Sequence, residues 1–286
     1  MPFWREKKKP PSKKELRPKR VKRAPPKKAT AEKVKTPTER IWVKTGVPGF
    51  DALLKKGIPK GVAILVAGGP GTGKTIFCLQ TLYNAVREGH KCLYITLEEA
   101  PERLWRHMEE FGWDTKELEK KGLTILKRDP FKIARSVEAL LENLKGRLPI
   151  DITEATELIP KGPTPYMIAL DSISALESAF TGRPESYRIY IEQLFRLFER
   201  LGATTFLITE TEEAPKTFSR SGVEEFLADG VLVLYNFKVR DLRVRAIEVL
   251  KMRGMKHVGK IVPFHITENG MEVYPSERLY EIREVE

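Results

Sequence analysis

The sequence predicts an α/β fold in which a mainly parallel β-sheet is flanked by helices and extended by antiparallel strands. Short apolar runs rich in β-branched residues alternate with stretches of helical periodicity between residues 41 and 210, which is the pattern of βαβ units. A glycine-rich turn joins one of these runs to a helix-like stretch. From Gly230 onward four apolar runs follow one another, which indicates hairpins added to the same sheet.

Ordered structure is expected to begin after Arg40. Residues 1–40 contain 16 Lys or Arg and four Glu, so they carry the whole net charge of +12 of the 286-residue chain. They are also rich in proline and poor in large apolar side chains, and such a composition cannot offset the entropy lost on ordering. We therefore predict a basic, disordered arm at residues 1–40 and a single α/β domain at residues 41–286.

The part of the domain before Gly230 is predicted to alternate between strands and helices. Strands are expected where short apolar runs occur, and helices where apolar residues recur at helical spacing. The expected strands are 61–68, 91–98, 123–127, 166–171 and 204–210, and the expected helices are 74–87, 101–111, 136–144 and 185–201. Residues 146–165 contain four prolines and are expected to form a long surface loop.

The part after Gly230 is predicted to consist of strands alone. The runs at 231–237, 243–252, 261–267 and 270–274 are separated by short turns and show no helical periodicity. Because short connections favour antiparallel pairing, these runs are expected to form hairpins at one edge of the parallel sheet.

One motif in the sequence carries recognisable chemistry. Residues 68–75 (GGPGTGKT) match the pattern G-x-x-x-x-G-K-[ST], whose bare backbone N–H groups surround phosphates and whose following helix adds its positive end. Lys74 is expected to contact the β and γ phosphates of ATP, and the Thr75 hydroxyl to bind Mg²⁺. An ordinary glycine-rich turn does not explain a Lys-Thr pair at this spacing. The expected nucleotide-binding residues here are Gly68, Gly69, Pro70, Gly71, Thr72, Gly73, Lys74, Thr75 and Ile76.

Acidic residues end two of the expected parallel strands. Asp171 is expected to hold Mg²⁺ through water at the crevice side of the sheet, although a strand-end Asp can also cap the next turn. Ser172 is expected either to approach the γ phosphate or to cap a helix. Hydrolysis needs a carboxylate that orients water, and either Glu98 or Glu99 is placed for it. We favour Glu98, while solvated charges before a helix remain the alternative for both.

Composition sets limits on the compartment and on other kinds of site. The only cysteines, Cys78 and Cys92, do not make a disulfide framework, so a reducing, cytoplasmic location is expected. The sequence has neither the apolar stretch of a signal peptide nor a membrane-spanning segment, so no membrane partner is expected. The four histidines show no metal-ligand spacing among themselves or with the cysteines.

Taken together, these motifs resemble those of KaiC-like ATPases of the RecA superfamily, in particular the archaeal single-domain type. The resemblance covers about residues 41–275 and keeps the order of its motifs. They are 45–61 (TGVPGFDALLKKGIPKG), 97–104 (LEEAPERL), 111–114 (FGWD), 223–234 (VEEFLADGVLVL), 250–257 (LKMRGMKH) and 264–275 (FHITENGMEVYP).

The resemblance implies a RecA-like core and an assembly. By this resemblance, identical subunits would form rings, commonly hexamers, that bind ATP between neighbouring subunits. Carried onto this chain, Lys251, Arg253 and His257 would reach the ATP of the adjacent protomer, where a cation can stabilise charge on the γ phosphate. By spacing alone, Lys251 and Arg253 are only alternating residues of a strand.

The leading hypothesis is therefore an ATPase that hydrolyses MgATP within a ring of identical subunits. Two alternatives stay open: a nucleotide-gated scaffold or signalling module with little turnover, and a serine/threonine kinase that phosphorylates itself. The chain departs from the clock proteins of the family because it holds one copy of the domain after a basic arm. That arm is expected either to bind DNA or RNA without sequence preference or to remain a solvated tail.

Overall fold

The structure, a computed structural model, describes residue 1 and residues 40–144, 156–212, 217–219 and 221–279. The predicted basic arm, apart from its two end residues, and the first half of the predicted 146–165 loop lie outside the described residues. The described residues within 40–279 belong to one compact unit of the chain.

The core of this unit is a nine-stranded sheet with the strand order β11-β10-β9-β8-β3-β7-β6-β4-β5. The strands from β5 to β8 in this order run parallel, while β8, β9, β10 and β11 pair as antiparallel hairpins. The antiparallel extension of the same sheet is as predicted, and β8, which pairs in parallel with β3, joins the two parts. The bounds are β3 Ala63–Gly68, β4 Cys92–Thr96, β5 Leu123–Lys127, β6 Met167–Asp171, β7 Thr204–Glu210, β8 Gly230–Val239, β9 Leu242–Met252, β10 Val262–Thr267 and β11 Gly270–Val273.

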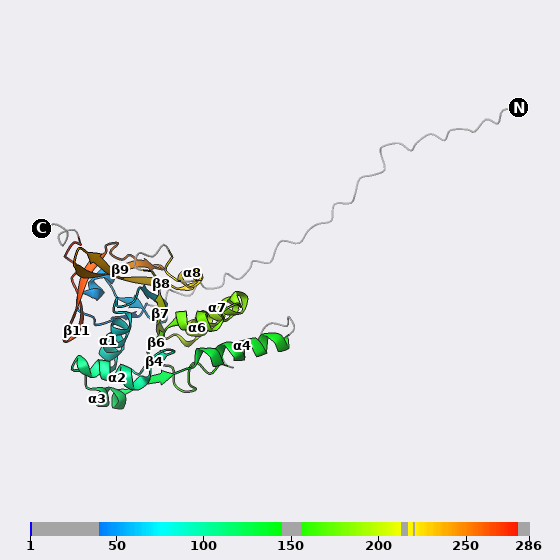
Figure 1. Cartoon of the computed structure of the whole chain (residues 1–286), viewed down its shortest axis with the longest axis horizontal. Helices are drawn as coiled ribbons and strands as arrows, with labels where there is room; N and C mark the ends of the chain where they lie inside the picture. The colour runs from blue at the N-terminus through cyan, green and yellow to red at the C-terminus, as the bar shows by residue number, and fades with distance from the viewer. Residues whose placement is uncertain (2–39, 145–155, 213–216, 220, 280–286) are drawn as a thin grey trace, which may run out of the picture. The chain divides into compact units, whose positions relative to one another are not determined.

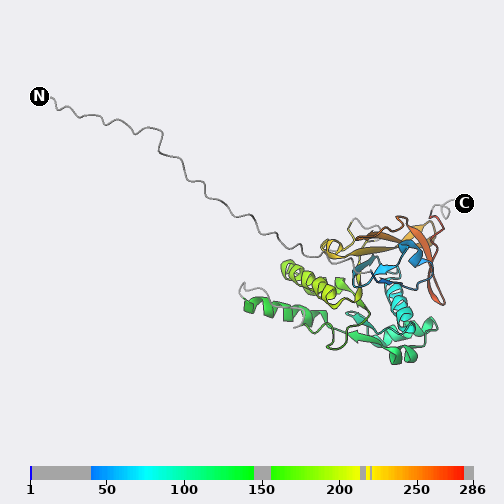
Figure 2. The same ribbon diagram turned by 180° about the vertical axis from the view of Figure 1, so that it is seen from behind.

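Helices cover both faces of the parallel part of the sheet (Figures 1 and 2). One face is covered by α1 (Lys74–Arg87), α2 (Pro101–Glu110) and α3 (Thr115–Lys121). The other is covered by α4 (Pro130–Leu144), α6 (Ile173–Ala179) and α7 (Pro184–Leu201). A four-residue helix, α8 (Glu224–Leu227), precedes β8, and a small antiparallel pair, β1 (Trp42–Val43) with β2 (Ile58–Pro59), encloses the 3-10 helix η1 (Phe50–Leu54).

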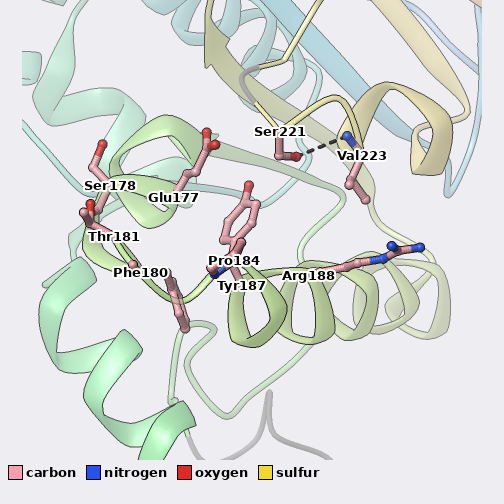
Figure 3. Close-up of a pocket in the computed structure, with 10 residues that line it drawn as sticks. Glu177, Ser178, Phe180, Thr181, Pro184, Tyr187, Arg188, Ser221 and Val223 are labelled. Carbon is pink, nitrogen blue, oxygen red and sulfur yellow. Dashed lines mark hydrogen bonds between the residues drawn. The ribbon is translucent and has the colours of Figure 1, made fainter.

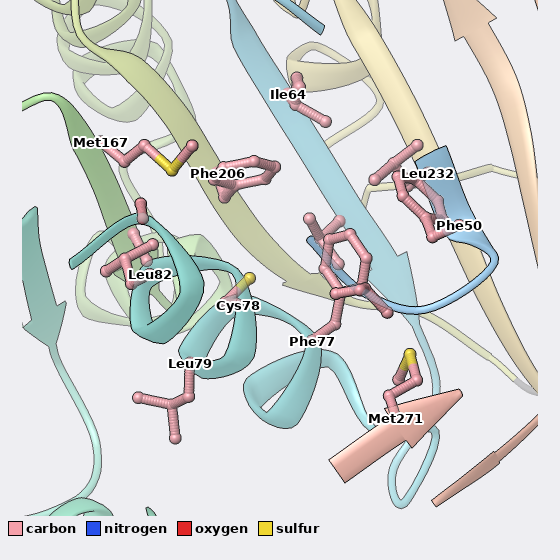
Figure 4. Packing of buried hydrophobic residues seen from close by; sticks show 14 of the residues in the cluster. Phe50, Ile64, Phe77, Cys78, Leu79, Leu82, Met167, Phe206, Leu232 and Met271 are labelled. Atoms are coloured by element: carbon pink, nitrogen blue, oxygen red, sulfur yellow. The ribbon is translucent and has the colours of Figure 1, made fainter. Parts of the chain in front are cut away.

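The alternation of side chains along β3 explains how two cores form on one sheet. Ile64 and Val66 pack toward α1, whereas Ala63 and Leu65 pack toward α6 and α7, because successive residues of a strand face opposite sides. Figure 4 shows the first core, in which Phe77 of α1 lies edge-on to other rings. Both ends of β3 are thus held in place, and its carboxyl end carries the glycine-rich loop.

The last hairpin folds back onto α1. The side-chain amide of Gln80 pairs with both backbone groups of Met271 in β11: Gln80 Nε2 donates to the carbonyl (3.1 Å), and the Met271 N–H donates to Oε1 (2.6 Å). These two buried hydrogen bonds hold β11 against α1.

Several element boundaries differ from the sequence predictions for local reasons. Helix α4 begins at Pro130, six residues before the predicted start, because the Asp129 carboxylate accepts hydrogen bonds from the N–H groups of Phe131 (2.9 Å) and Lys132 (3.3 Å). Helices α3 and α6 were not expected, since seven residues are too few for a clear period. Among the described residues, no helix is both long and apolar enough to cross a bilayer.

Candidate nucleotide-binding site

The glycine-rich loop connects β3 to α1, and its glycines are required by its backbone. Gly71 and Gly73 have positive φ angles of 70° and 92°, a conformation that other residues adopt only with strain. A Cβ on Gly68 would lie 2.4 Å from the Leu234 carbonyl oxygen. The Thr72 hydroxyl closes the loop by donating to the Gly69 carbonyl at 2.8 Å.

Lys74, the first residue of α1, brings a buried cation to the loop. Its Nζ donates to the carbonyls of Gly68 (2.8 Å) and Gly69 (2.9 Å). Burial lowers the pKa of the Lys74 ammonium, an effect that the nearby carboxylates, Glu210 first among them, partly oppose. A buried ammonium at a helix N-terminus favours the binding of an anion.

Asp171 ends β6 directly beside the loop. Its Oδ2 accepts hydrogen bonds from the Thr75 hydroxyl (2.9 Å) and the Tyr94 hydroxyl (2.6 Å). Burial raises the pKa of the Asp171 carboxyl, while these two hydrogen bonds favour the charged form and lower it. A hydroxyl and a carboxylate within 2.9 Å of each other form an oxygen donor set that fits Mg²⁺.

The side chains of the two candidate glutamates have different surroundings in the structure. Strand β4 ends at Thr96, so Glu98 and Glu99 lie in the bend that follows it and not on the predicted strand. Glu98 Oε1 accepts a short hydrogen bond from the Ser172 hydroxyl and adds to the negative potential at Lys74 and Asp171. Glu99 Oε2 instead faces Arg103 Nε on α2 at 3.4 Å, in an ion pair whose glutamate side chain is partly buried. Glu98 is therefore the carboxylate that faces the loop.

Ser172 has the capping role that its position suggested, while its approach to the γ phosphate stays a prediction. Its Oγ accepts a hydrogen bond from the Ala175 N–H (3.2 Å) and so caps α6, while the same hydroxyl donates to Glu98. Ile76 is partly buried and packs against the apolar core on the α1 side of the sheet. Ser172 thus fixes Glu98 near the loop, whereas Ile76 offers the site only its backbone.

Three residues near the loop were not singled out from the sequence. Tyr94, fully buried on β4, holds Asp171; Glu210 ends β7 beside Gly68; and Arg245 Nε of β9 donates to the Gly71 carbonyl at 3.2 Å. Glu210 could have been identified from the sequence, because it also ends an apolar run that forms a parallel strand. Tyr94 and Arg245 had none, because their contacts join residues far apart in the chain.

Lys251 and Arg253 lie far from the Gly68–Thr75 loop within this chain. In the sheet, Gly68 pairs with Leu234 near the middle of β8, whereas Lys251 pairs with Val231 at the amino end of β8. Each residue of a strand adds about 3.3 Å, so these cations sit at the opposite end of the sheet from the Gly68–Thr75 loop. His257 lies beyond them, and its Nδ1 is buried without a hydrogen-bond partner among the described residues.

A separate cavity of about 450 Å³ opens between α6, α7 and residues 221–223 (Figure 3). In its wall the Tyr187 hydroxyl donates to the buried carboxylate of Glu224, which also accepts from the Ser221 hydroxyl at 2.5 Å. None of the predicted nucleotide-site residues lines this cavity. This cavity is therefore separate from the Gly68–Thr75 loop.

A strand, a glycine-rich loop and a helix that begins with a buried lysine, beside an aspartate held by the following threonine, define a RecA-like P-loop protein. The family profile described as "ATPase: KaiC" matches residues 43–278. The chain belongs to the KaiC ATPase family.

Known proteins similar to this chain include both short and long members. A UPF0273 protein of Aeropyrum pernix is 36% identical over 236 residues, which is 82% of this chain and 93% of that protein. The circadian clock oscillator protein KaiC of Synechococcus elongatus is 34% identical over 82% of this chain but only 44% of its own length. The crystal structure of a KaiC-like protein of Pyrococcus horikoshii, 33% identical, superposes with a TM-score of 0.67 over 83% of this chain and all of that one.

Proposed function

We propose that this protein binds MgATP at residues 68–75 and hydrolyses it in an assembly of identical subunits. The observation that carries the proposal is the convergence of Lys74, Thr75, Asp171 and Glu98 at the carboxyl edge of the parallel strands. Ligands of α/β sheets bind at this edge. A cation for phosphate, an oxygen pair for a hard metal ion and a carboxylate that can orient water are what phosphoryl transfer to water requires.

Each of these groups would have its own role in the reaction. The backbone N–H groups of the loop and the Lys74 ammonium would bind the phosphates, and Thr75 and Asp171 would hold Mg²⁺, Asp171 through water. Mg²⁺ held by these residues would neutralise charge on the phosphate oxygens. Glu98, held by Ser172, would orient the attacking water.

The positions of Lys251 and Arg253 favour an action between subunits. Both cations lie at the amino end of β8, away from the loop of their own chain, so neither can serve the nucleotide bound there. A closed ring joins one surface of each subunit to a different surface of the next. In such a ring, the two cations and His257 would approach the ATP of the neighbour and stabilise charge on its γ phosphate.

The replacement Lys74→Ala tests the site. Phosphate release from MgATP should fall by about 100-fold or more, because a cation placed against developing charge contributes on that order. Lys116→Ala, an exposed lysine of α3, is the matched control and should keep the wild-type rate. Unchanged turnover in Lys74→Ala would refute the site.

The same preparation separates hydrolysis from the two alternative functions. A hydrolase releases inorganic phosphate over many turnovers. A nucleotide-gated scaffold binds ATP and releases almost none, and an autokinase leaves label from γ-labelled ATP on the protein.

We also propose that the basic arm binds nucleic acid through its phosphates. Its 16 Lys or Arg against four Glu support this, since the release of counterions drives such binding. Affinity for single- and double-stranded DNA should be similar, fall steeply with salt and disappear when the chain begins at Arg40. Equal affinity of the full and shortened chains would contradict a role for the arm.

A further inference from the structure

Lys251 and Arg253, the two cations proposed to act on the neighbour's ATP, bind the carboxyl end of α8. Lys251 Nζ donates to the carbonyls of Glu225 (2.9 Å) and Ala228 (2.8 Å). The Arg253 guanidinium donates to the two carbonyls between them, to Leu227 from Nη1 (3.2 Å) and to Phe226 from Nη2. Four consecutive carbonyls that a helix end leaves without partners are thereby satisfied.

Asp229, the next residue along the chain, connects this arrangement to the strand that carries the P-loop. Its Oδ1 faces Arg253 Nη1 at 3.4 Å, and its Oδ2 accepts from the Ala63 N–H at 3.2 Å. Backbone bonds strengthen the connection: Asp229 N–H donates to the Ala63 carbonyl (2.8 Å), and Arg253 N–H donates to the Asp229 carbonyl (2.7 Å). Asp229 therefore bridges the first residue of β3 and the Arg253 guanidinium.

These contacts use the Nη1–Nη2 end of the Arg253 guanidinium and leave its Nε side available. Nη1 and Nη2 point at α8 and Asp229, whereas Nε makes no hydrogen bond to any residue that the structure describes. The Nε–H and one N–H of Nη2 form the edge with which arginine grips two oxygens of a phosphate or carboxylate. About half of the Arg253 side chain (52%) is exposed, so a second molecule can reach this side chain.

From this geometry we infer that Asp229 is a positioning residue for trans catalysis. It fixes the end of the Arg253 guanidinium on α8 and β3 and so presents the Nε edge to the γ phosphate bound by the next subunit. This inference rests on the proposed function, because it requires Arg253 to act on the neighbour's nucleotide. Fixing a cation before the reaction avoids the cost of ordering it in the transition state.

The replacement Asp229→Asn isolates this role. The asparagine keeps a carbonyl oxygen for the Ala63 N–H, so the attachment to β3 is retained, but it loses the charge that orients Arg253. The control is Asp241→Asn, which removes an exposed carboxylate from the turn between β8 and β9. Melting temperature and assembly size should match the wild type in both variants.

The test uses mixed assemblies of full-length chains. Arg253→Ala subunits, which keep an intact P-loop, are mixed with Lys74→Ala subunits, which supply Arg253 but cannot turn over their own ATP. Mixing should restore phosphate release above that of either variant alone. With Lys74→Ala/Asp229→Asn as the second partner, the restored kcat should be about three- to tenfold lower at unchanged KM, since misplacement of a catalytic group costs on this order or more. The partner Lys74→Ala/Asp241→Asn should restore as much as Lys74→Ala.

The outcomes separate the two proposals. If Lys74→Ala subunits restore nothing, the action of Arg253 between subunits is wrong and the inference fails with it. If they restore activity and the Asp229→Asn partner restores it equally well, action in trans stands and the positioning role of Asp229 is overturned.

Discussion

The Thr75 hydroxyl donates a hydrogen bond of 2.9 Å to the Asp171 carboxylate, across 96 residues of sequence. This bond joins the first turn of α1 to the end of β6 and brings a hydroxyl and a carboxylate oxygen to one point. The pair fixes where a metal ion would bind relative to the loop, and the surrounding burial sets the cost of keeping Asp171 charged.

Asp171→Asn should lower activity and raise stability. Turnover should fall by about 100-fold because the metal loses its anionic partner. Burial raises the pKa of Asp171 in the folded state, so the wild-type carboxyl destabilises the fold as pH rises through that pKa. In the absence of nucleotide, the variant should melt at a higher temperature at pH 7 and show no advantage near pH 3. A variant that is less stable at pH 7 would contradict this account of Asp171.

Tyr94→Phe should shift the pH dependence of turnover. The Tyr94 hydroxyl stabilises the charged form of Asp171, so its removal raises the pKa of Asp171 further. The acidic limb of the kcat/KM profile should then move to higher pH, and KM for MgATP at pH 6 should rise by about three- to tenfold, as the net loss of about 0.7–1.4 kcal/mol from one hydrogen bond implies. Superimposable profiles of the variant and the wild type would show that Tyr94 has no part in the site.

Glu98→Gln and Glu99→Gln form a matched pair of adjacent substitutions. Glu98 faces Ser172 and the loop, whereas Glu99 pairs with Arg103 at the surface. Glu98→Gln should bind ATP normally but turn over about 100-fold more slowly, since general bases contribute on that scale. Glu99→Gln should stay within about twofold of the wild type, because exposed ion pairs contribute little. The reverse order of rates would transfer the role to Glu99.

Gln80→Leu should destabilise the fold by about 2–4 kcal/mol. The change leaves the buried N–H and C=O of Met271 without their partner, and each unsatisfied group costs about 1–3 kcal/mol. Denaturation in urea measures the free energy of unfolding. A loss below about 0.5 kcal/mol, well under the cost of one such group, would mean that β11 does not depend on this helix contact.

Local patterns in the sequence were enough to predict the parallel sheet and the residues of its carboxyl edge. The loop at 68–75 is contiguous, and Asp171 ends an apolar run, so both can be located without knowing the fold. The sequence favoured Glu98 over Glu99 as residues at the end of a strand, whereas in the structure their difference depends on a bend after Thr96 that the Thr96 hydroxyl stabilises.

The rest of the site depends on pairings that no local pattern contains. Tyr94 reads as one more apolar residue of a buried strand until β4 and β6 are placed side by side. The contacts of Lys251 and Arg253 with α8 likewise require the register of β8 and β9, which brings residues 225–229 beside residues 251–253. Periodicity identifies elements, whereas pairing partners follow from the packing of the whole sheet.

The most direct test of the central claim is a crystal structure with Mg²⁺ and a non-hydrolysable ATP analogue. We expect the triphosphate on the backbone N–H groups of residues 69–75, the Lys74 ammonium moved from the loop carbonyls to the phosphates, and Mg²⁺ bound by Thr75. A loop that stays empty at saturating nucleotide, with Lys74 still bonded to the carbonyls of Gly68 and Gly69, would contradict the account.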